Sequence, residues 1–242
     1  MFFPALPMEF LPKSLNKQDK IKKIWLELQA AEHVLIIGPG LKTIDPSLLP
    51  VDYTHLLYID GGAALKKHQS LSRFSAHSLI IGDKDSCLDP ELEFDFLLPT
   101  NKDESDLSFA LKLLSPKVRK LTLLGFSGGR FDHELSNLGV LDDFINYANS
   151  SVESFFHREV TIDQFIKLFS KGHHHFTHQG LFSVFTLKKQ LLNISGNVAY
   201  PFNSKNSLLP FQSQGLSNIA YGEVIIQSEE NFLVIFAEKD QR

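Results

Sequence analysis

The stretch Leu121-Thr122-Leu123-Leu124-Gly125-Phe126-Ser127-Gly128-Gly129-Arg130-Phe131-Asp132-His133 indicates a strand, a short turn and the start of a helix. Its first four residues are typical of a buried strand, and helical spacing of apolar side chains continues to Tyr147. Glycines let the backbone approach an anion closely, Arg130 supplies a planar cation, and amides at a helix start carry partial positive charge. The stretch favours a bound polyphosphate, although a glycine pair after a strand is by itself only evidence of a tight turn.

Apolar runs with strand character alternate with helical patterns in the first part of the chain. The runs are Val34–Ile37, Leu56–Ile59, Leu79–Ile81, Phe94–Leu98, Leu121–Leu124 and Val152–His157. Helical patterns occupy segments 16–31 (with Asn16 as the capping residue), 63–74, 106–114 and 133–147. Continuous apolar strands that alternate with helices predict an α/β fold with a parallel sheet flanked by helices. In such sheets, ligands bind outside the carboxyl ends of the strands.

The pattern changes after residue 158 to short β-rich runs separated by Gly, Asn and Ser. These runs are Phe165–Phe169, Leu181–Leu187, Val224–Gln227 and Phe232–Phe236. We therefore expect an α/β domain over 1–158, whose first 15 residues form an irregular arm, followed by a small antiparallel β domain over 159–242. His173, His174, His175 and His178 are interpreted as part of a His-rich β-turn, because adjacent residues of an extended segment point to opposite faces and do not converge on one metal ion.

Composition restricts the class of partner. The chain has 242 residues, 43% of them hydrophobic, and a formal net charge of −4, which does not favour binding to nucleic acid or to an anionic membrane. Cys87 is the single cysteine, so no intrachain disulfide can form and a cytoplasmic location is expected. No apolar run approaches the roughly 20 residues of a membrane span, and the prolines of the first segment make it a poor signal peptide. A small-molecule substrate is therefore expected.

Acidic clusters follow three of the expected strands. They are Asp60-Gly61-Gly62, Gly82-Asp83-Lys84-Asp85-Ser86 and Asn101-Lys102-Asp103-Glu104-Ser105-Asp106-Leu107. Each one alone fits a solvated turn or a helix cap. With the Gly-Gly-Arg turn, however, four strand ends carry charged or glycine-rich clusters, and carboxylates beside a phosphate site are the usual ligands of Mg²⁺. Together they favour a shared site for Mg²⁺ and a polyphosphate.

The order and spacing of these clusters resemble the thiamin pyrophosphokinase family. Gly128-Gly129-Arg130-Phe131-Asp132-His133 with Asn137 matches one family motif, and Gly215-Leu216-Ser217-Asn218 is similar to the signature of its thiamin domain. The segment Gly196-Asn197-Val198-Ala199-Tyr200-Pro201 is similar to the stretch that usually precedes that signature. The resemblance extends from about Val34 to Phe236. It implies that 1–158 is an α/β nucleotide-binding catalytic domain and that 159–242 is a β-sandwich domain that binds thiamin.

The resemblance implies a homodimer that transfers the pyrophosphoryl group of ATP to thiamin with Mg²⁺, with the thiamin pocket at the dimer interface. As metal ligands it implies Asp83, Asp85, Asp103 and Asp106. As ATP-binding residues it implies Asp60, Gly61, Gly62, Asp103, Gly128, Gly129, Arg130 and His133. For thiamin binding it implies Asp132, Ser217 and Asn218, and the residues it makes catalytic are Asp83, Asp85, Asp106, Arg130 and Asp132.

Three positions depart from the family pattern. Asn101 stands where the family commonly has a carboxylate, Lys84 where it often has an aromatic residue, and Ile219 where a polar or acidic residue is frequent. These departures leave the number of metal ions and the acceptor open. The alternatives are a pyrophosphokinase for another small alcohol, such as a pterin, and a non-catalytic sensor of thiamin or nucleotide. The sequence does not identify which carboxylate would take the acceptor's proton.

Overall fold

The computed structural model describes residues 6–44, 46, 49, 52–85, 87, 89–127, 130–148, 153–157, 164–203, 205 and 207–237. Within these ranges, only the backbone is considered for 153–157 and 164–165. All strands of the described residues belong to one twelve-stranded sheet with the order β10-β9-β11-β8-β12-β7-β6-β5-β1-β2-β3-β4. In the described part of the chain, no helix is long and apolar enough to cross a membrane.

The half of the sheet from β6 to β4 is parallel. Its strands are β1 (His33–Ile37), β2 (His55–Ile59), β3 (Ser78–Gly82), β4 (Phe96–Leu97), β5 (Lys120–Leu124) and β6 (Glu153–His157). Every residue of β1, β2 and β3 is buried, as expected for parallel strands covered on both faces. Their carboxyl ends therefore meet at one edge of the sheet, where a ligand site can form.

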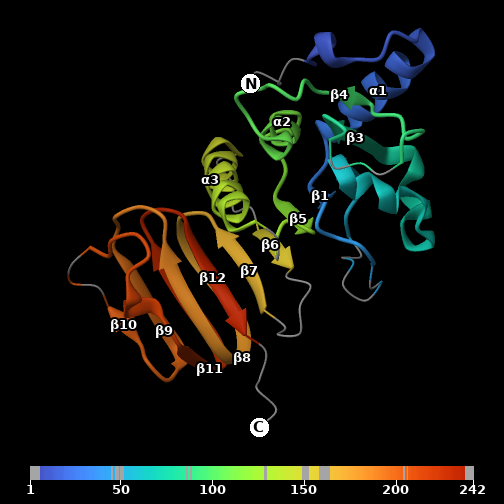
Figure 1. Cartoon of the computed structure of the whole chain (residues 1–242). Coiled ribbons are helices and arrows are strands. Elements are labelled where there is room, and N and C mark those ends of the chain that lie inside the picture. The colour runs from blue at the N-terminus through green and yellow to red at the C-terminus, as the bar shows by residue number, and fades with distance from the viewer. Residues whose placement is uncertain are drawn as a thin grey trace.

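Three α-helices accompany the parallel half: α1 (Leu15–Leu28), α2 (Asp106–Lys112) and α3 (Phe131–Ala148). Helix α1 begins one residue before the expected cap Asn16, and Ser14 occupies the capping position without a side-chain hydrogen bond. Helix α2 is capped by Ser105, whose hydroxyl accepts a hydrogen bond from the Ser108 amide at 3.1 Å. In Figure 1, α3 lies between the two halves of the molecule.

The segment expected as a helix over 63–74 is instead a pair of 3-10 helices, η3 (Asp60–Lys67) and η4 (Gln69–His77). A third, η1 (Met8–Phe10), lies in the expected N-terminal arm. Phe10 makes an edge contact with Phe109 of α2 at a ring-centroid distance of 5.3 Å, so this part of the arm packs on the domain.

The remaining half of the sheet is antiparallel. It consists of β7 (Gln164–Phe169), β8 (Gly172–Thr186), β9 (Leu192–Val198), β10 (Phe202–Asn203), β11 (Asn218–Ser228) and β12 (Phe232–Ala237). A short 3-10 helix, η5 (Ser213–Gly215), precedes β11. The fold class expected from the sequence is therefore confirmed: a parallel sheet with flanking helices and an antiparallel β part. The division at 158/159 falls outside the described residues, and β9 and β10 were not expected.

The histidine-rich run is a strand, which corrects the β-turn expected from the sequence. Strand β8 contains His173, His174, His175 and His178. Its residues 172–182 pair with the whole length of β11. A β-turn would need a chain reversal here, but hydrogen bonding to β11 keeps the segment extended. His174 Nε2 lies 2.7 Å from Ser170 O and His178 Nε2 lies 3.2 Å from Leu181 O, whereas His175 Nδ1 lies 3.6 Å from Glu223.

The two halves share one hydrogen-bonded sheet and one of the buried hydrophobic clusters. Strands β6 and β7 pair antiparallel, which joins the parallel strands directly to the antiparallel ones (Figure 1). Leu168 of β7 and Leu233 of β12 belong to the same buried cluster as Leu141 and Ile145 of α3. In addition, Asn231 Nδ2 donates a hydrogen bond to Asp142 Oδ1 at 2.7 Å. The orientation of the antiparallel half is thus fixed by both the backbone and the packing of α3.

Candidate functional site

A cavity of about 340 Å³ opens at the carboxyl edge of the parallel strands. Its walls come from the segments after β1, β2, β3 and β5, from the start of α2 and from the first turns of α3. The charged or amide-bearing residues that line it are Asp60, Asp83, Asp85, Lys102, Asp106, Arg130, His133, Glu134 and Asn137. The structure therefore brings the strand-end clusters of the sequence to one place.

Three carboxylates converge in this cavity. Asp60 directly follows β2 in a left-handed conformation (φ 47°), Asp83 directly follows β3, and Asp106 is the first residue of α2. Each offers an oxygen atom, and these oxygens lie within 4.8 Å of one another. Asp60 is buried and accepts a hydrogen bond from the Lys84 amide at 3.1 Å, so the turn after β3 holds this side chain. Asp60, expected only as a nucleotide contact, thus lies in the acidic group itself.

Lys102 supplies the cation that faces two of these carboxylates. Its Nζ donates a hydrogen bond to Asp83 Oδ2 at 2.6 Å and forms an ion pair with Asp106 Oδ1 at 3.0 Å. Sequence reasoning did not select Lys102. The available signal was its position between Asn101 and Asp103, four residues before Asp106, in the loop that opens a helix.

The pKa values in this group reflect its crowding. Burial opposes ionisation of Asp83, but the hydrogen bond and the charge of Lys102 outweigh it, and the pKa of Asp83 lies below its usual value. Burial raises the pKa of Asp106, and the nearby carboxylates of Asp83 and Asp60 act in the same direction. Burial would lower the pKa of Lys102, yet its two acidic partners raise it. The ammonium group of Lys102 therefore favours the ionised form of Asp83, whereas burial disfavours the ionised form of Asp106.

The other two expected metal ligands lie differently. Asp85 is exposed and lines the cavity, and its amide donates to Asp83 Oδ1 at 3.2 Å. Asp103 is exposed and is not among the residues that line the cavity. Ser86, the residue after Asp85, lies outside the described residues.

The Gly-Gly-Arg turn is described only from Arg130 onward, since Gly128 and Gly129 lie outside the described residues. Arg130 Nε donates to Asp132 Oδ1 at 3.1 Å, and Nη2 donates to Asp132 Oδ2 at 2.5 Å. The hydrogen bonds and charge of Arg130 lower the pKa of Asp132 to about 2. Arg130 and His133 line the cavity, whereas Asp132 points its carboxylate at Arg130 on the exposed rim. The guanidinium group of Arg130 can bind a phosphate once its hydrogen bonds to Asp132 are broken.

Gly40 and Gly125 line the cavity, and sequence reasoning missed Gly40 and its neighbour Gly38. Gly38 and Gly40, after β1, pass so close to Gly125 that a Cβ on either would lie 2.8 Å from Gly125 O. Gly125 itself has φ 78°, a conformation that side chains disfavour. Of the glycines expected to bind ATP, Gly62 is required by packing, because its Cβ would lie 2.4 Å from Ile37 O. Gly61 and Gly62 are not among the residues lining the cavity.

Two of the three expected thiamin contacts, Ser217 and Asn218, lie in the antiparallel half, apart from this cavity. Ser217 has φ 56°, and its amide donates to Ser183 Oγ at 3.1 Å. Asn218 is buried, donates to Tyr200 O at 2.6 Å and accepts from the amides of Tyr200 and Ile219 at 3.1 and 2.8 Å. Neither Ser217 nor Asn218 lines the cavity at the strand ends. In this structure Asn218 anchors the loop that presents Tyr200.

The acidic trio has the donor chemistry of a magnesium site. Mg²⁺ prefers oxygen ligands and is usually held by one or two carboxylates together with phosphates and water. Asp106 Oδ1 is buried and faces Lys102 Nζ at 3.0 Å. Three carboxylates whose oxygens lie within 4.8 Å of one another offer the ligand type that such an ion prefers.

Solved structures of thiamin pyrophosphokinases have the same fold. A family protein from Enterococcus faecalis has a TM-score of 0.63 and 21% identity, with 86% of this chain and 100% of that one covered. The enzyme from Bacillus subtilis gives a TM-score of 0.61 at 18% identity over 86% and 100% of the two chains. The enzyme from Candida albicans gives 0.64 at 15% identity over 85% and 89%.

Sequence comparison identifies the family directly. No curated protein sequence matches this chain significantly. Residues 52–153, however, match the family model described as the catalytic domain of thiamin pyrophosphokinase. The matched segment contains the acidic trio, Lys102 and the Gly-Gly-Arg turn, so the family assignment and the cavity concern the same residues. Residues 52–153 are therefore assigned to the catalytic domain of the thiamin pyrophosphokinase family, and most of the chain shares the fold of that family's solved structures.

Proposed function

We propose that this protein transfers the pyrophosphoryl group of ATP to the hydroxyethyl oxygen of thiamin, which yields thiamin diphosphate and AMP. The observation that carries the proposal is the convergence of Asp60, Asp83 and Asp106 beside Lys102 and Arg130 in one cavity. Such a site suits a polyphosphate with a divalent cation, because transfer of phosphoryl groups depends mainly on positioning and on neutralising charge.

Within this proposal, Asp60, Asp83 and Asp106 hold Mg²⁺, with Asp85 at the rim as a further oxygen donor and Asp103 as an outer contact. When bound, Mg²⁺ would neutralise charge on the phosphate oxygens and orient them. Lys102 contributes a point charge beside Asp83, and Arg130 supplies a planar donor fork for the transferred group or for AMP. Gly128, Gly129 and His133 complete the nucleotide contacts. A carboxylate beside the acceptor hydroxyl takes its proton.

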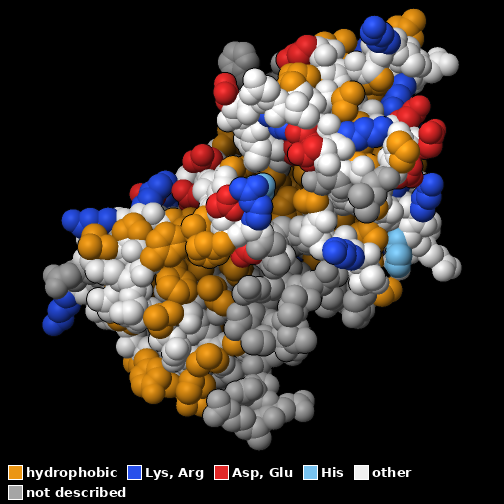
Figure 2. Space-filling view, in the orientation of Figure 1, with side chains coloured by type: hydrophobic (Ala, Val, Ile, Leu, Met, Phe, Trp, Pro, Cys, Tyr) orange, Lys and Arg blue, Asp and Glu red, His pale blue; other side chains and the backbone are white. Residues whose placement is uncertain are grey.

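We further propose a cytoplasmic homodimer in which Ser217, Asn218 and Asp132 contact thiamin. In one chain, Ser217 and Asn218 do not line the cavity, so the proposal places thiamin between these residues of one chain and the cavity of the other. Exposed apolar side chains near Asn218 support this arrangement: Leu181, Tyr200, Leu216 and Tyr221. Figure 2 shows hydrophobic side chains gathered over the antiparallel half. Sedimentation velocity should give a dimer, and a monomer at catalytic concentration would contradict this part.

The central test incubates the purified protein with ATP, Mg²⁺ and thiamin and measures both products. We expect AMP and thiamin diphosphate in equal amounts. Replacing thiamin by a pterin alcohol should give no AMP, and AMP formed only with the pterin would identify a different acceptor. Tight binding of thiamin and ATP without AMP under varied metal and pH would indicate a sensor.

Variants connect the activity to the cavity. Asp83→Asn and Asp85→Asn should each abolish turnover while the circular dichroism spectrum stays unchanged, since each removes a charge at the expected cation site. Asp89→Asn is the matched control, because Asp89 lies in the same loop but does not line the cavity. Full activity of Asp83→Asn would remove that residue from its assigned role.

A further inference from the structure

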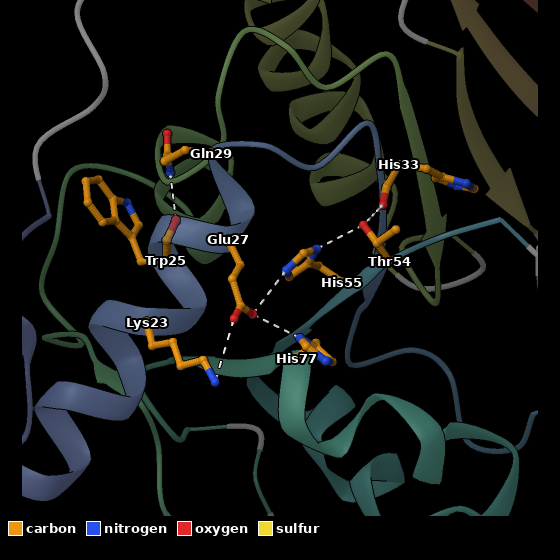
Figure 3. A network of polar contacts seen from close by, with 8 residues as sticks. All are labelled: Lys23, Trp25, Glu27, Gln29, His33, Thr54, His55 and His77. Carbon is orange, nitrogen blue, oxygen red and sulfur yellow. Dashed lines mark hydrogen bonds and ion pairs between the residues drawn. The ribbon is translucent and has the colours of Figure 1, made fainter.

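A second group of candidate ligands lies at the opposite edge of the parallel sheet. Glu27 is near the end of α1, His55 is the first residue of β2, and His77 ends η4 just before β3. Figure 3 shows the three side chains pointing toward one another. The candidate cavity lies at the carboxyl ends of these strands, whereas His55 and His77 mark their amino ends. This group is therefore separate from the proposed active site.

The three side chains place their ligand atoms close together. Glu27 Oε2 lies 2.9 Å from His77 Nδ1 and 3.8 Å from His55 Nε2, and one ligand atom from each residue lies within 4.8 Å of the others. Ligands of a tetrahedral zinc ion at about 2.0–2.1 Å are separated from one another by roughly 3.3 Å. The observed separations lie on both sides of that value, so small side-chain rotations would allow all three to contact one ion.

The hydrogen bonding of His55 leaves the lone pair of one ring nitrogen without a hydrogen-bond donor. Thr54 Oγ1 donates to His33 O at 3.3 Å, so it accepts from the Nδ1–H of His55 at 2.9 Å. In that neutral tautomer, Nε2 carries a lone pair, as in histidines whose other nitrogen is fixed by an outer partner. His55 is only 7% exposed, and Nε2 is buried with no hydrogen-bond partner among the described residues.

This lone pair faces a carboxylate, which is unfavourable unless a cation lies between them. Protonation of His55 could supply one, but burial lowers the pKa of His55 and the charge of His77 lowers it further, against the attraction of Glu27. Lys23 Nζ lies 3.9 Å from the other oxygen, Glu27 Oε1, and is largely exposed, so it leaves Oε2 for a ligand role.

We propose that Glu27, His55 and His77 bind a first-row transition-metal dication such as Zn²⁺, with water in the fourth position. Two imidazoles and one carboxylate form a donor set that suits zinc rather than Mg²⁺, which requires oxygen ligands in an octahedron. His77 is half-exposed, so the ion has a path of entry and space for the water. The bound ion links α1 to the starts of β2 and β3 and stabilises this edge of the domain.

The direct test titrates Zn²⁺ into metal-free protein by calorimetry in excess Mg²⁺, which occupies the acidic trio. We expect one zinc ion per chain, an X-ray absorption spectrum with two imidazole ligands, and a rise in melting temperature of about 5–10 °C at a hundredfold excess over Kd. Absence of binding, or a spectrum with oxygen ligands alone, overturns the proposal.

Two variants locate the ion. Glu27→Gln and His77→Gln replace partly exposed side chains, so the fold should persist, and each should weaken zinc binding at least tenfold. The matched control is His175→Gln, because His175 also lies beside a carboxylate, Glu223, on the exposed face of β8. Zinc affinity that is unchanged in both ligand variants, or lost in the control, contradicts the site. If a variant fails to fold, the imidazole NMR signals of His55 and His77 in the wild-type protein must still shift with zinc, and unshifted signals overturn the proposal.

Discussion

Lys102 Nζ lies 2.6 Å from Asp83 Oδ2, and both side chains are largely buried, with 15% and 8% of their areas exposed. One ammonium group thus faces the carboxylates that follow β3 and open α2. This contact connects the loop after β4 to the end of β3 and keeps the acidic trio compact. The same carboxylates are those we propose as ligands of a divalent cation, so the charge of Lys102 should affect both stability and cation binding.

Lys102→Met should destabilise the protein by about 3 kcal/mol, because a buried ion pair loses one partner and leaves an uncompensated carboxylate. Mg²⁺ should restore part of the loss, since it can neutralise Asp83 and Asp106 in place of the ammonium group. Urea unfolding with and without Mg²⁺ measures both effects. Lys112→Met is the control, as Lys112 forms an exposed pair with Glu104, and its loss should be below about 1 kcal/mol.

Acid unfolding should separate Asp83 from Asp106. The folded-state pKa of Asp83 is lowered, so its stabilisation is present above the unfolded value of 3.8 and is lost as pH falls through the folded value. The pKa of Asp106 is raised, so the folded state takes up a proton first and gains relative stability as pH falls toward 3.8. Asp83→Asn should flatten the loss of stability in acid, and Asp106→Asn should steepen it. The free energy of unfolding, measured with urea between pH 3 and 6, should therefore depend differently on pH in the two variants. The same pH dependence in both would contradict the assignment.

Gly62→Ala should cost about 1–3 kcal/mol, because the new Cβ would lie 2.4 Å from Ile37 O and the backbone would have to shift. Gly139→Ala is the matched change in α3, where nothing lies within 4 Å of the added atom. There the variant should be more stable by about 0.5–1 kcal/mol, because alanine favours helix and reduces the freedom of the unfolded chain. Thermal unfolding of the two variants measures the expected loss of stability in Gly62→Ala and the expected gain in Gly139→Ala.

Asn218→Ala should destabilise the protein by about 1–2 kcal/mol, since it leaves part-buried backbone groups of the Tyr200 loop without their protein partner. If this loop borders the thiamin pocket, the variant should also weaken thiamin binding while ATP binding is unchanged. Asn197→Ala removes only one exposed contact of 3.4 Å to Tyr221 O and should change neither property. Calorimetric titration of each ligand distinguishes the outcomes.

The fold was largely predictable because its parallel strands are short, apolar and buried on both faces. The misses have local reasons. Strand β9 has a half-exposed, polar sequence with Gly196 in it, so no apolar run marks it. Histidines at the start of β8 resemble a turn until β11 pairs with them. The segment after β2 has helical spacing, yet folds as successive 3-10 helices.

Within the site, the sequence indicated which strand ends carry acids but not which side chains turn inward. Asp60, Asp83 and Asp106 meet because β2, β3 and α2 start or end at the same edge of the sheet. Lys102 and Asp103 are adjacent, yet one is buried against Asp83 and the other is exposed, a difference set by the path of the loop. Gly38 and Gly40 are required by the approach of Gly125, which is distant in sequence.

The position of β12 has a consequence for biogenesis. This strand lies between β7 and β8, yet the ribosome makes it after every other strand of the antiparallel half. Until it emerges, the facing edges of β7 and β8 have no backbone partner, and Leu168 lacks its contact with Leu233. Unpaired strand edges attract other chains. We therefore expect nascent molecules to depend on a chaperone late in translation, and chains truncated before Phe232 to aggregate.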